Sequence, residues 1–171
     1  MMEEVKMKKI KLMMMVLLVS VVAVGCSSAS NGETNTPATE ETTSNVSLKE
    51  VAAQLGEKEY IIMPLEISDE EAKEIYHVNT DVVEDYGIAK TGRMPGLGFA
   101  FMVKAKEGKL EEAKAIVEQV KADQVGNAFY PYEVEAAESA EILVNGDYVA
   151  LFILNDEVKA DAIKLYEDAI K

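Results

Sequence analysis

The residue with the most distinctive chemistry is Arg93, the only arginine among the 171 residues of the chain. It lies in the segment 91–98, which has glycines at positions 92, 96 and 98. Glycine lets a backbone approach a ligand closely, and a guanidinium binds a carboxylate or phosphate through two parallel hydrogen bonds. The segment is therefore either an anion-binding loop or a hairpin connection whose arginine pairs with a nearby acid. We favour the connection, and the Gly-Lys-Ser/Thr ending of a nucleotide-binding loop is missing.

A second candidate surface is the aromatic run around Pro131. Phe129, Tyr130 and Tyr132 flank this proline within four residues. Aromatic rings of this kind fill cores, and they also recur where two proteins meet. We expect core packing and keep partner contact as the alternative. Tyr130, Tyr132 and Arg93 are the residues we select for ligand or partner binding.

The sequence offers few groups for catalysis or metal binding. His77 is the only histidine, and no Gly-x-Ser-x-Gly pattern surrounds Ser68 or Ser139, the available hydroxyls. Carboxylates such as those at 69–71 match the acidic preference of a helix N-terminus. The chain has neither the spacing of a calcium loop nor that of a zinc site. We therefore predict no catalytic residues, no metal and no cofactor, with His77 at the surface or at a helix end.

Charge excludes one class of partner. The chain carries a net charge of −14, and the part after Cys26 has 13 basic and 29 acidic residues. Such a chain repels phosphate backbones, so we expect no nucleic-acid partner, and it does not adhere electrostatically to anionic lipid. With one cysteine there is no intrachain disulfide, and the fold depends on packing alone.

The N-terminal segment carries an export signal. A lysine-rich stretch at 7–11 precedes the apolar run from Leu12 to Val24, whose thirteen residues are fewer than the roughly 20 that span a bilayer. Glu3 and Glu4 are unusual in such a segment, so we expect translation to start at Met7. The sequence thus predicts a signal peptide over 1–25 in preference to a transmembrane helix.

The six residues 23–28, Ala-Val-Gly-Cys-Ser-Ser, resemble the lipobox of bacterial lipoproteins. The resemblance implies that Cys26 receives a diacylglyceryl thioether and acyl chains of the palmitate type. A thiolate is the nucleophile this chemistry needs, and two chains give stable anchoring. Ala23 departs from the branched aliphatic residue usual at its position. The expected localisation is the outer face of the cell membrane, held by lipid.

Residues 26–46 form the lipidated cysteine and a linker rich in Ser, Thr, Asn and Glu. This composition buries too little apolar surface to fold, and 20 flexible residues span about 25 Å. The composition changes at Ser47, where a single domain over 47–171 begins.

The domain is predicted to be α+β: a small antiparallel sheet of about four strands with helices packed on it. Two short helices come first, opened by the capping boxes 47–50 and 68–71. Two strand-strand-helix units follow, similar through duplication or by chance. The expected elements are strands at 82–91 and 97–104, a helix at 109–124 closed by Gly126, strands at 140–144 and 148–154 joined by the turn Asn145-Gly146, and a helix at 157–170 with Asp156 as its N-cap.

Several of these features together resemble a known family. They are the capped helix ending near Tyr76, the aromatic-Tyr-x-x-x-acid stretch from Tyr130 to Glu135, and the hairpin from Asn145 to Val149. The pattern resembles the small bacterial lipoproteins grouped as domain of unknown function 4358, over residues 47–171. The resemblance implies the lipoprotein address and the fold, and it implies no functional residue.

Three classes of function remain. We favour a non-enzymatic accessory lipoprotein that presents its domain to an extracytoplasmic protein. The alternative is a small-ligand binder that uses the loop from Gly92 to Gly98, although binding lipoproteins of the transport type need two lobes and about twice this length. A small cell-envelope hydrolase is the least favoured, because the catalytic constellation is missing. A deep pocket beside Arg93 would favour the binder, and an exposed aromatic patch rimmed by acids would favour the interaction module.

Overall fold

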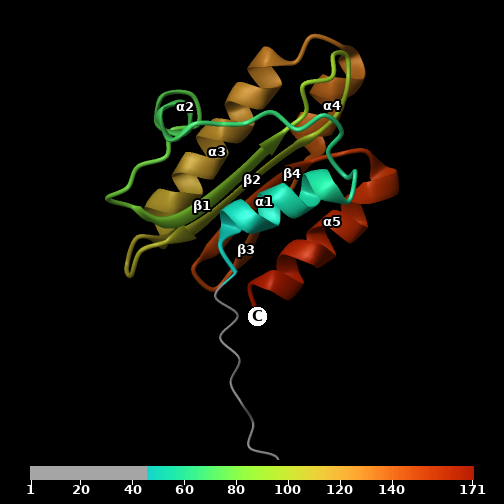
Figure 1. Ribbon diagram of the computed structural model, residues 1–171. Coiled ribbons are helices and arrows are strands. Elements are labelled where there is room, and N and C mark those ends of the chain that lie inside the picture. Colours follow the sequence, from blue (N-terminus) through green and yellow to red (C-terminus); the bar gives the residue numbers. More distant parts are fainter. Residues whose placement is uncertain (1–45) are drawn as a thin grey trace, which may run out of the picture. The chain divides into compact units, whose positions relative to one another are not determined.

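The computed structural model describes residues 46–171, which contain five helices and a four-stranded sheet (Figure 1). The elements are α1 (Leu48–Glu57), α2 (Asp69–Glu74), β1 (Val83–Lys90), β2 (Phe99–Ala105), α3 (Leu110–Asn127), α4 (Pro131–Ser139), β3 (Ile142–Asn145), β4 (Tyr148–Ile153) and α5 (Asp156–Ala169). The predicted signal peptide, the predicted start at Met7, Cys26 and the predicted linker up to residue 45 lie outside the described residues. No helix within residues 46–171 is long and apolar enough to cross a membrane.

The sheet is antiparallel throughout, with the strand order β1-β2-β4-β3. The central pair β2 and β4 aligns Phe101 with Leu151 and Val103 with Val149. Every residue of β4 after Tyr148 is buried, as expected for a strand covered on both faces. The α+β prediction of about four antiparallel strands with packed helices is confirmed.

Helices cover both faces of the sheet (Figure 1). Side chains alternate along β2, so Phe99, Phe101 and Val103 join the apolar cluster under α2, α3 and α4. Ala100 and Met102 join the cluster under α1 and α5 on the opposite face. The helices of the two strand-strand-helix units, α3 and α5, therefore lie on opposite faces. A twofold rotation that exchanged the hairpins β1–β2 and β3–β4 within the antiparallel sheet would place α3 and α5 on the same face. No such rotation therefore relates the two units.

Helix α1 packs closely on the edge strand β1. Its buried residues are those the helical spacing predicts: Leu48, Val51, Ala52 and Leu55. The contact is close because β1 has a glycine there, and a Cβ on Gly87 would lie 2.0 Å from the Leu48 carbonyl oxygen. The Leu48 N–H donates to Asp85 Oδ2 at 2.8 Å, which fixes the start of α1 on β1.

The helix ends differ from the predictions in three places. The Ser47 hydroxyl accepts from the Lys49 N–H, whereas the predicted box paired it with Glu50. Helix α3 runs through Gly126 to Asn127, and α5 has Asn155 rather than Asp156 as its N-cap. These are shifts of one to three residues, within the range that local signals leave undetermined. The capping box from Ser68 to Glu71 is confirmed.

Helix α4 is an element that the sequence analysis missed. The expected elements include no helix between 124 and 140, yet a helix begins at Pro131. Proline is favoured in the first helical position, and an acidic residue suits the first turn, where Glu133 lies. Pro131 followed by Glu133 is thus a sequence pattern that predicts a helix start. The aromatic residues on either side of Pro131 favoured a different interpretation, packing in the core.

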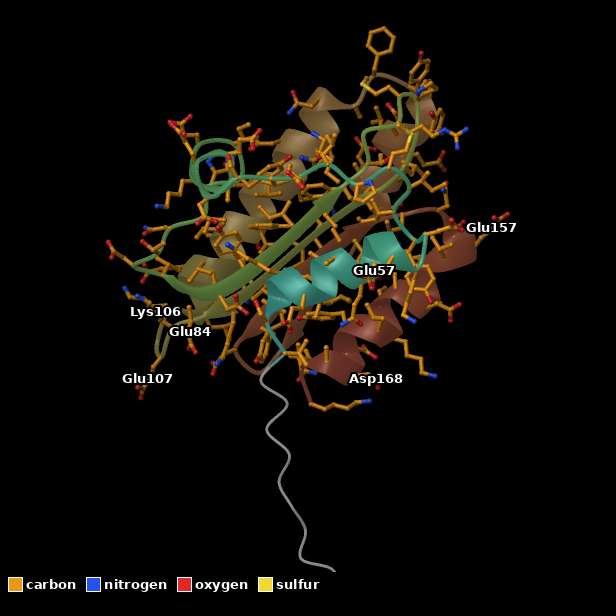
Figure 2. The ribbon with its side chains drawn as sticks, in the orientation of Figure 1. Glu57, Glu84, Lys106, Glu107, Glu157 and Asp168 are labelled. Carbon is orange, nitrogen blue, oxygen red and sulfur yellow. The ribbon has the colours of Figure 1, made fainter. Side chains whose placement is uncertain are left out.

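Charged side chains project outward around the described domain. Glu57, Glu84, Lys106, Glu107, Glu157 and Asp168 all point away from the sheet (Figure 2). No charged side chain of the described residues is buried. The core of the described domain therefore has no charged side chain for chemistry, and any site that uses one lies at the surface.

Candidate functional site

The structure brings together two segments that sequence analysis had selected separately. The β1–β2 loop supplies Arg93 and Met94, and α4 supplies Tyr132, with its N-cap Tyr130 and Phe129 just before the helix. We call these five residues the Arg93 surface. All five are exposed, Met94 to 84% and Phe129 to 81%. The expectation that the aromatic run packs in the core is therefore wrong, because α4 turns it outward.

Glu133 fastens the two segments to each other. Its Oε1 accepts from the Gly96 N–H at 3.2 Å and from the Tyr132 hydroxyl at 3.3 Å. Its Oε2 accepts from the N–H groups of Phe129 and Tyr130, both at 3.2 Å. Loss of solvation would raise the pKa of Glu133, but the three backbone N–H donors outweigh it and leave the pKa below its ordinary value. Glu133 is thus ionised at neutral pH, and it holds the β1–β2 loop against the start of α4. No pattern in the sequence indicated this role.

The aromatic rings of the Arg93 surface contact one another. Phe129 meets Tyr130 edge-on with ring centroids 5.2 Å apart, and Tyr130 stacks on Tyr132 at 5.8 Å. These spacings fall in the favourable range for aromatic pairs. The rings therefore form one exposed cluster.

The guanidinium of Arg93 forms no ion pair with any residue of the described part of the chain. The expectation that a nearby acid pairs with it is not met. Its backbone N–H donates to Thr91 Oγ1 at 3.1 Å, which shapes the loop and leaves the side chain exposed. Partial desolvation and Glu133 raise the pKa of Tyr132, and the positive charge of Arg93 opposes them. Arg93 therefore lies within electrostatic reach of Tyr132.

A hollow of about 320 Å³ opens beside Arg93. The loop forms one wall, the end of α3 and the start of α4 form the other, and Leu97, Phe99 and Ile153 contribute apolar surface. A volume of this size is at the lower limit of small-molecule sites, which range from about 300 to 1,000 Å³. The hollow can take one apolar side chain or a small molecule, with an anionic group directed at Arg93.

The residues considered for catalysis bond to other groups. His77 Nε2 lies 2.7 Å from Asp123 Oδ2, a contact that joins the segment after α2 to α3. This contact with His77 lowers the pKa of Asp123. The Ser68 hydroxyl caps α2, and the Ser139 hydroxyl donates to a carbonyl within α4. Among residues 46–171, no group of three acidic, histidine or cysteine side chains could hold a metal.

Comparison with known proteins gives one match. No curated protein and no solved structure matches the chain. A family model matches residues 59–154, which is more than half of the chain. The match contains the β1–β2 loop, the whole sheet and α4. It excludes α1 and α5, so it is narrower than the expected 47–171. On this match, the chain belongs to the family described as domain of unknown function (DUF4358).

Proposed function

We propose that the chain is a non-enzymatic interaction module, anchored to the outer face of the cell membrane through diacylglyceryl-Cys26. Its docking surface is the Arg93 surface, and its partner is an extracytoplasmic protein. The lipobox-like segment 23–28 supports the anchor. The observation that carries the docking role is the exposed cluster of Phe129, Tyr130 and Tyr132.

Exposure of these rings has a cost that a partner would remove. A phenylalanine side chain gains about 1.5–3 kcal/mol when it is fully buried, and Phe129 is 81% exposed. Aromatic residues, methionine and arginine are enriched in the centres of protein interfaces. The Arg93 surface combines all three kinds of residue. A docked protein would bury the rings and shield Arg93 from water.

The hollow and Arg93 together define the chemistry of the partner. The hollow takes an apolar side chain, and the free guanidinium takes a carboxylate next to it. The domain is strongly acidic overall, with 13 basic and 26 acidic residues from 47 onward. At the hollow, the cations that can attract a partner carboxylate are Arg93 and Lys90, which both line it. We infer a protein segment that carries an apolar residue beside an acidic one.

A small anionic ligand is the second candidate, and the hollow beside Arg93 favours it. Such a ligand would fill the 320 Å³ and pair with Arg93. The rings of Phe129, Tyr130 and Tyr132 lie outside the lining of this hollow. A small ligand would leave the cluster exposed, so the protein partner accounts for more of the surface.

The test is site-specific photo-crosslinking in intact cells. A benzoyl-phenylalanine replaces Phe129, and the matched control carries it at Ile75, which is 54% exposed on a different element. We expect a discrete crosslinked protein at position 129 that is absent at position 75. Arg93→Ala should abolish this product and barely change the melting temperature, because the guanidinium is exposed and forms no ion pair with the described residues. Such surface substitutions usually change stability by less than about 0.5 kcal/mol. Arg93→Lys should also fail, since lysine has no planar fork.

The two candidates give different outcomes. A small ligand predicts no product at position 129, together with thermal stabilisation by small carboxylates or phosphates that Arg93→Ala removes. If Arg93→Ala and Tyr132→Ala both keep the crosslink, the Arg93 surface is not the docking site. If neither a crosslink nor a ligand effect is found, the loop is only a connection between two strands.

A further inference from the structure

A second candidate site lies on β1, which forms one edge of the sheet. The Thr91 N–H donates to the Gly98 carbonyl. Because the direction alternates along a strand, Thr91, Ala89 and Gly87 direct their backbone N–H and C=O groups toward β2. By strand alternation, Tyr86, Ile88 and Lys90 direct theirs outward. The outward edge is already used at one end, where the Leu65 N–H donates to the Lys90 carbonyl at 2.8 Å.

The chain itself pairs with this edge at one position only. Pro64 forms an antiparallel bridge with Thr91, and residues 65–68 form no further bridge with β1 before α2 begins at Asp69. The Tyr86 N–H is occupied by Asp85 Oδ1 at 2.8 Å. Within the described part of the chain, the N–H and C=O of Ile88 have no hydrogen-bonding partner. A free edge of this kind is the surface that strand addition requires.

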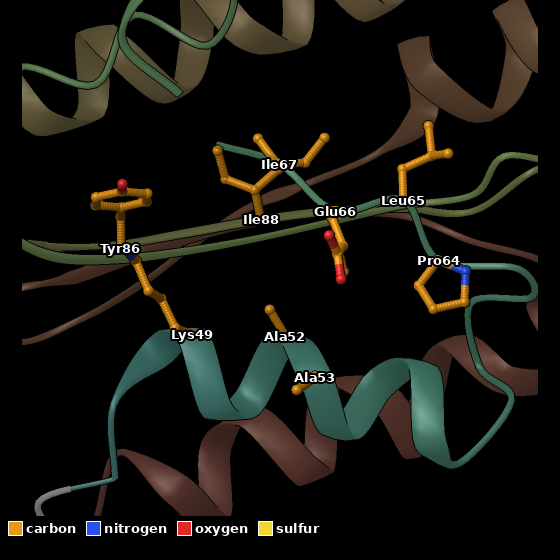
Figure 3. A pocket seen from close by; sticks show the side chains of 10 residues that line it. Lys49, Ala52, Ala53, Pro64, Leu65, Glu66, Ile67, Tyr86 and Ile88 are labelled. Carbon is orange, nitrogen blue, oxygen red and sulfur yellow. The ribbon is translucent and has the colours of Figure 1, made fainter. Parts of the chain in front are cut away.

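A cleft of about 390 Å³ lies directly along this edge. Helix α1 forms one wall and residues 64–67 form the other, with the β1 residues Tyr86 and Ile88 between them (Figure 3). The wall on α1 consists of Lys49 and two alanines, Ala52 and Ala53, whose short side chains leave room for an incoming side chain.

The charges of the cleft select a basic occupant. Glu66 projects toward α1 (Figure 3), and it forms no ion pair or hydrogen bond with another described residue. Lys49, the lysine of the cleft, is already held by Asp69 at 2.7 Å and lies 4.9 Å above the Tyr86 ring. The unpaired carboxylate and the acidic domain both attract a cation. A second copy of this chain is disfavoured, because two chains with a net charge of −14 repel each other.

We propose that the free edge of β1 accepts an extended basic segment of a partner protein as a fifth strand. Its backbone pairs with Ile88, a small apolar side chain lies between Ala53 and Ile67, and a lysine or arginine pairs with Glu66. Backbone hydrogen bonds supply affinity in this mode, and the cleft supplies selectivity. This site is separate from the Arg93 surface and does not rest on the function proposed for it.

The experiment uses the full-length chain purified in mild detergent and a displayed library of linear seven-residue peptides. The most enriched peptide is synthesised with blocked ends and serves as the probe. We expect it to contain lysine or arginine and to slow the hydrogen exchange of the Ile88 amide. Methylation of the peptide nitrogen that pairs with the Ile88 carbonyl should weaken binding about tenfold or more.

Two pairs of variants locate the binding. Ala53→Phe fills the cleft from an exposed helical position, and Ala122→Phe is its control on α3, where it lines neither hollow. Glu66→Gln removes the charge, and Glu57→Gln on α1 is its control. We expect about tenfold weaker binding for the first member of each pair and no change for the second. Tyr132→Ala should have no effect, which separates this result from the Arg93 surface.

Several results would overturn the proposal. These are a selection that enriches no peptide or only acidic ones, an Ile88 amide that exchanges equally fast with and without the peptide, and binding unaffected by Ala53→Phe. Sedimentation that shows a dimer abolished by Ala53→Phe would assign the edge to a second copy of the chain and would also overturn it.

Discussion

Replacing Gly87 with alanine tests how tightly α1 packs on the sheet. The added methyl would lie 2.0 Å from the carbonyl oxygen of Leu48 and 2.5 Å from its carbonyl carbon. Both atoms belong to the backbone of α1, so no side chain can rotate to relieve the contact. Either α1 moves away from β1 by more than an ångström or the strand bends.

The magnitude follows from what α1 buries. Detaching the helix would expose Leu48, Val51 and Leu55, which are all fully buried, at about 1.5–3 kcal/mol each. Distorting a packed core instead costs typically 1–3 kcal/mol, and more where the backbone must move. The cheaper response is distortion, so we expect a loss of about 3 kcal/mol. For a domain of this size that lowers the melting temperature by about 10 °C.

Gly126→Ala is the matched control, because it makes the same chemical change in an open place. A Cβ at Gly126 meets no heavy atom within 4 Å, and the residue lies in the last turn of α3. Alanine is the better helix former, so this variant should gain up to about 0.5–1 kcal/mol. The assay is urea denaturation followed by circular dichroism. A Gly87→Ala chain as stable as the parent would show that the packing of α1 on β1 is looser than described.

Three further predictions address other parts of the chain. The Tyr166 hydroxyl is buried with no hydrogen-bonding partner among the described residues, and burial raises its pKa. Tyr166→Phe should therefore stabilise the domain by about 1 kcal/mol. A loss of stability in urea denaturation would contradict this. His77 lowers the pKa of Asp123 from its ordinary 3.8, so the contact stabilises the fold above about pH 4 and is lost as the pH falls through the lowered value. His77→Ala should accordingly flatten the loss of stability between about pH 4 and pH 2, and an unchanged pH profile would refute the contact. Cys26→Ser should abolish labelling by a lipid analogue, and continued labelling with unchanged membrane fractionation would refute the anchor.

Local patterns in the sequence were sufficient for most of the elements. The turn Asn145-Gly146 and its flanking apolar runs predict the β3–β4 hairpin because that turn geometry depends on two adjacent residues. Ser68 and Glu71 predict the start of α2, because a capping box depends on two residues three positions apart. The α+β class follows from the order of these elements. Their end positions are less determined, since Asn155 and Asp156 are both suitable caps.

The candidate site was only partly predictable. Arg93 and the tyrosines could be selected from their residue types, but their joining through Glu133 depends on a contact between positions 96 and 133, which are far apart in the sequence. The outward direction of Phe129 was predicted wrongly because aromatic residues usually gain free energy by burial. Only the orientation of α4 on α3 decides which way these rings point.

The sequence by itself determined most of the elements, the acidic character of the domain and the isolation of its single arginine, because composition, periodicity and capping act over a few residues. The tertiary structure alone decided that α3 and α5 cover opposite faces and that Arg93 meets an aromatic cluster. It also decided that β1 keeps a free edge beside α1. These features depend on which distant segments share the limited area of one sheet, and no short pattern encodes that choice.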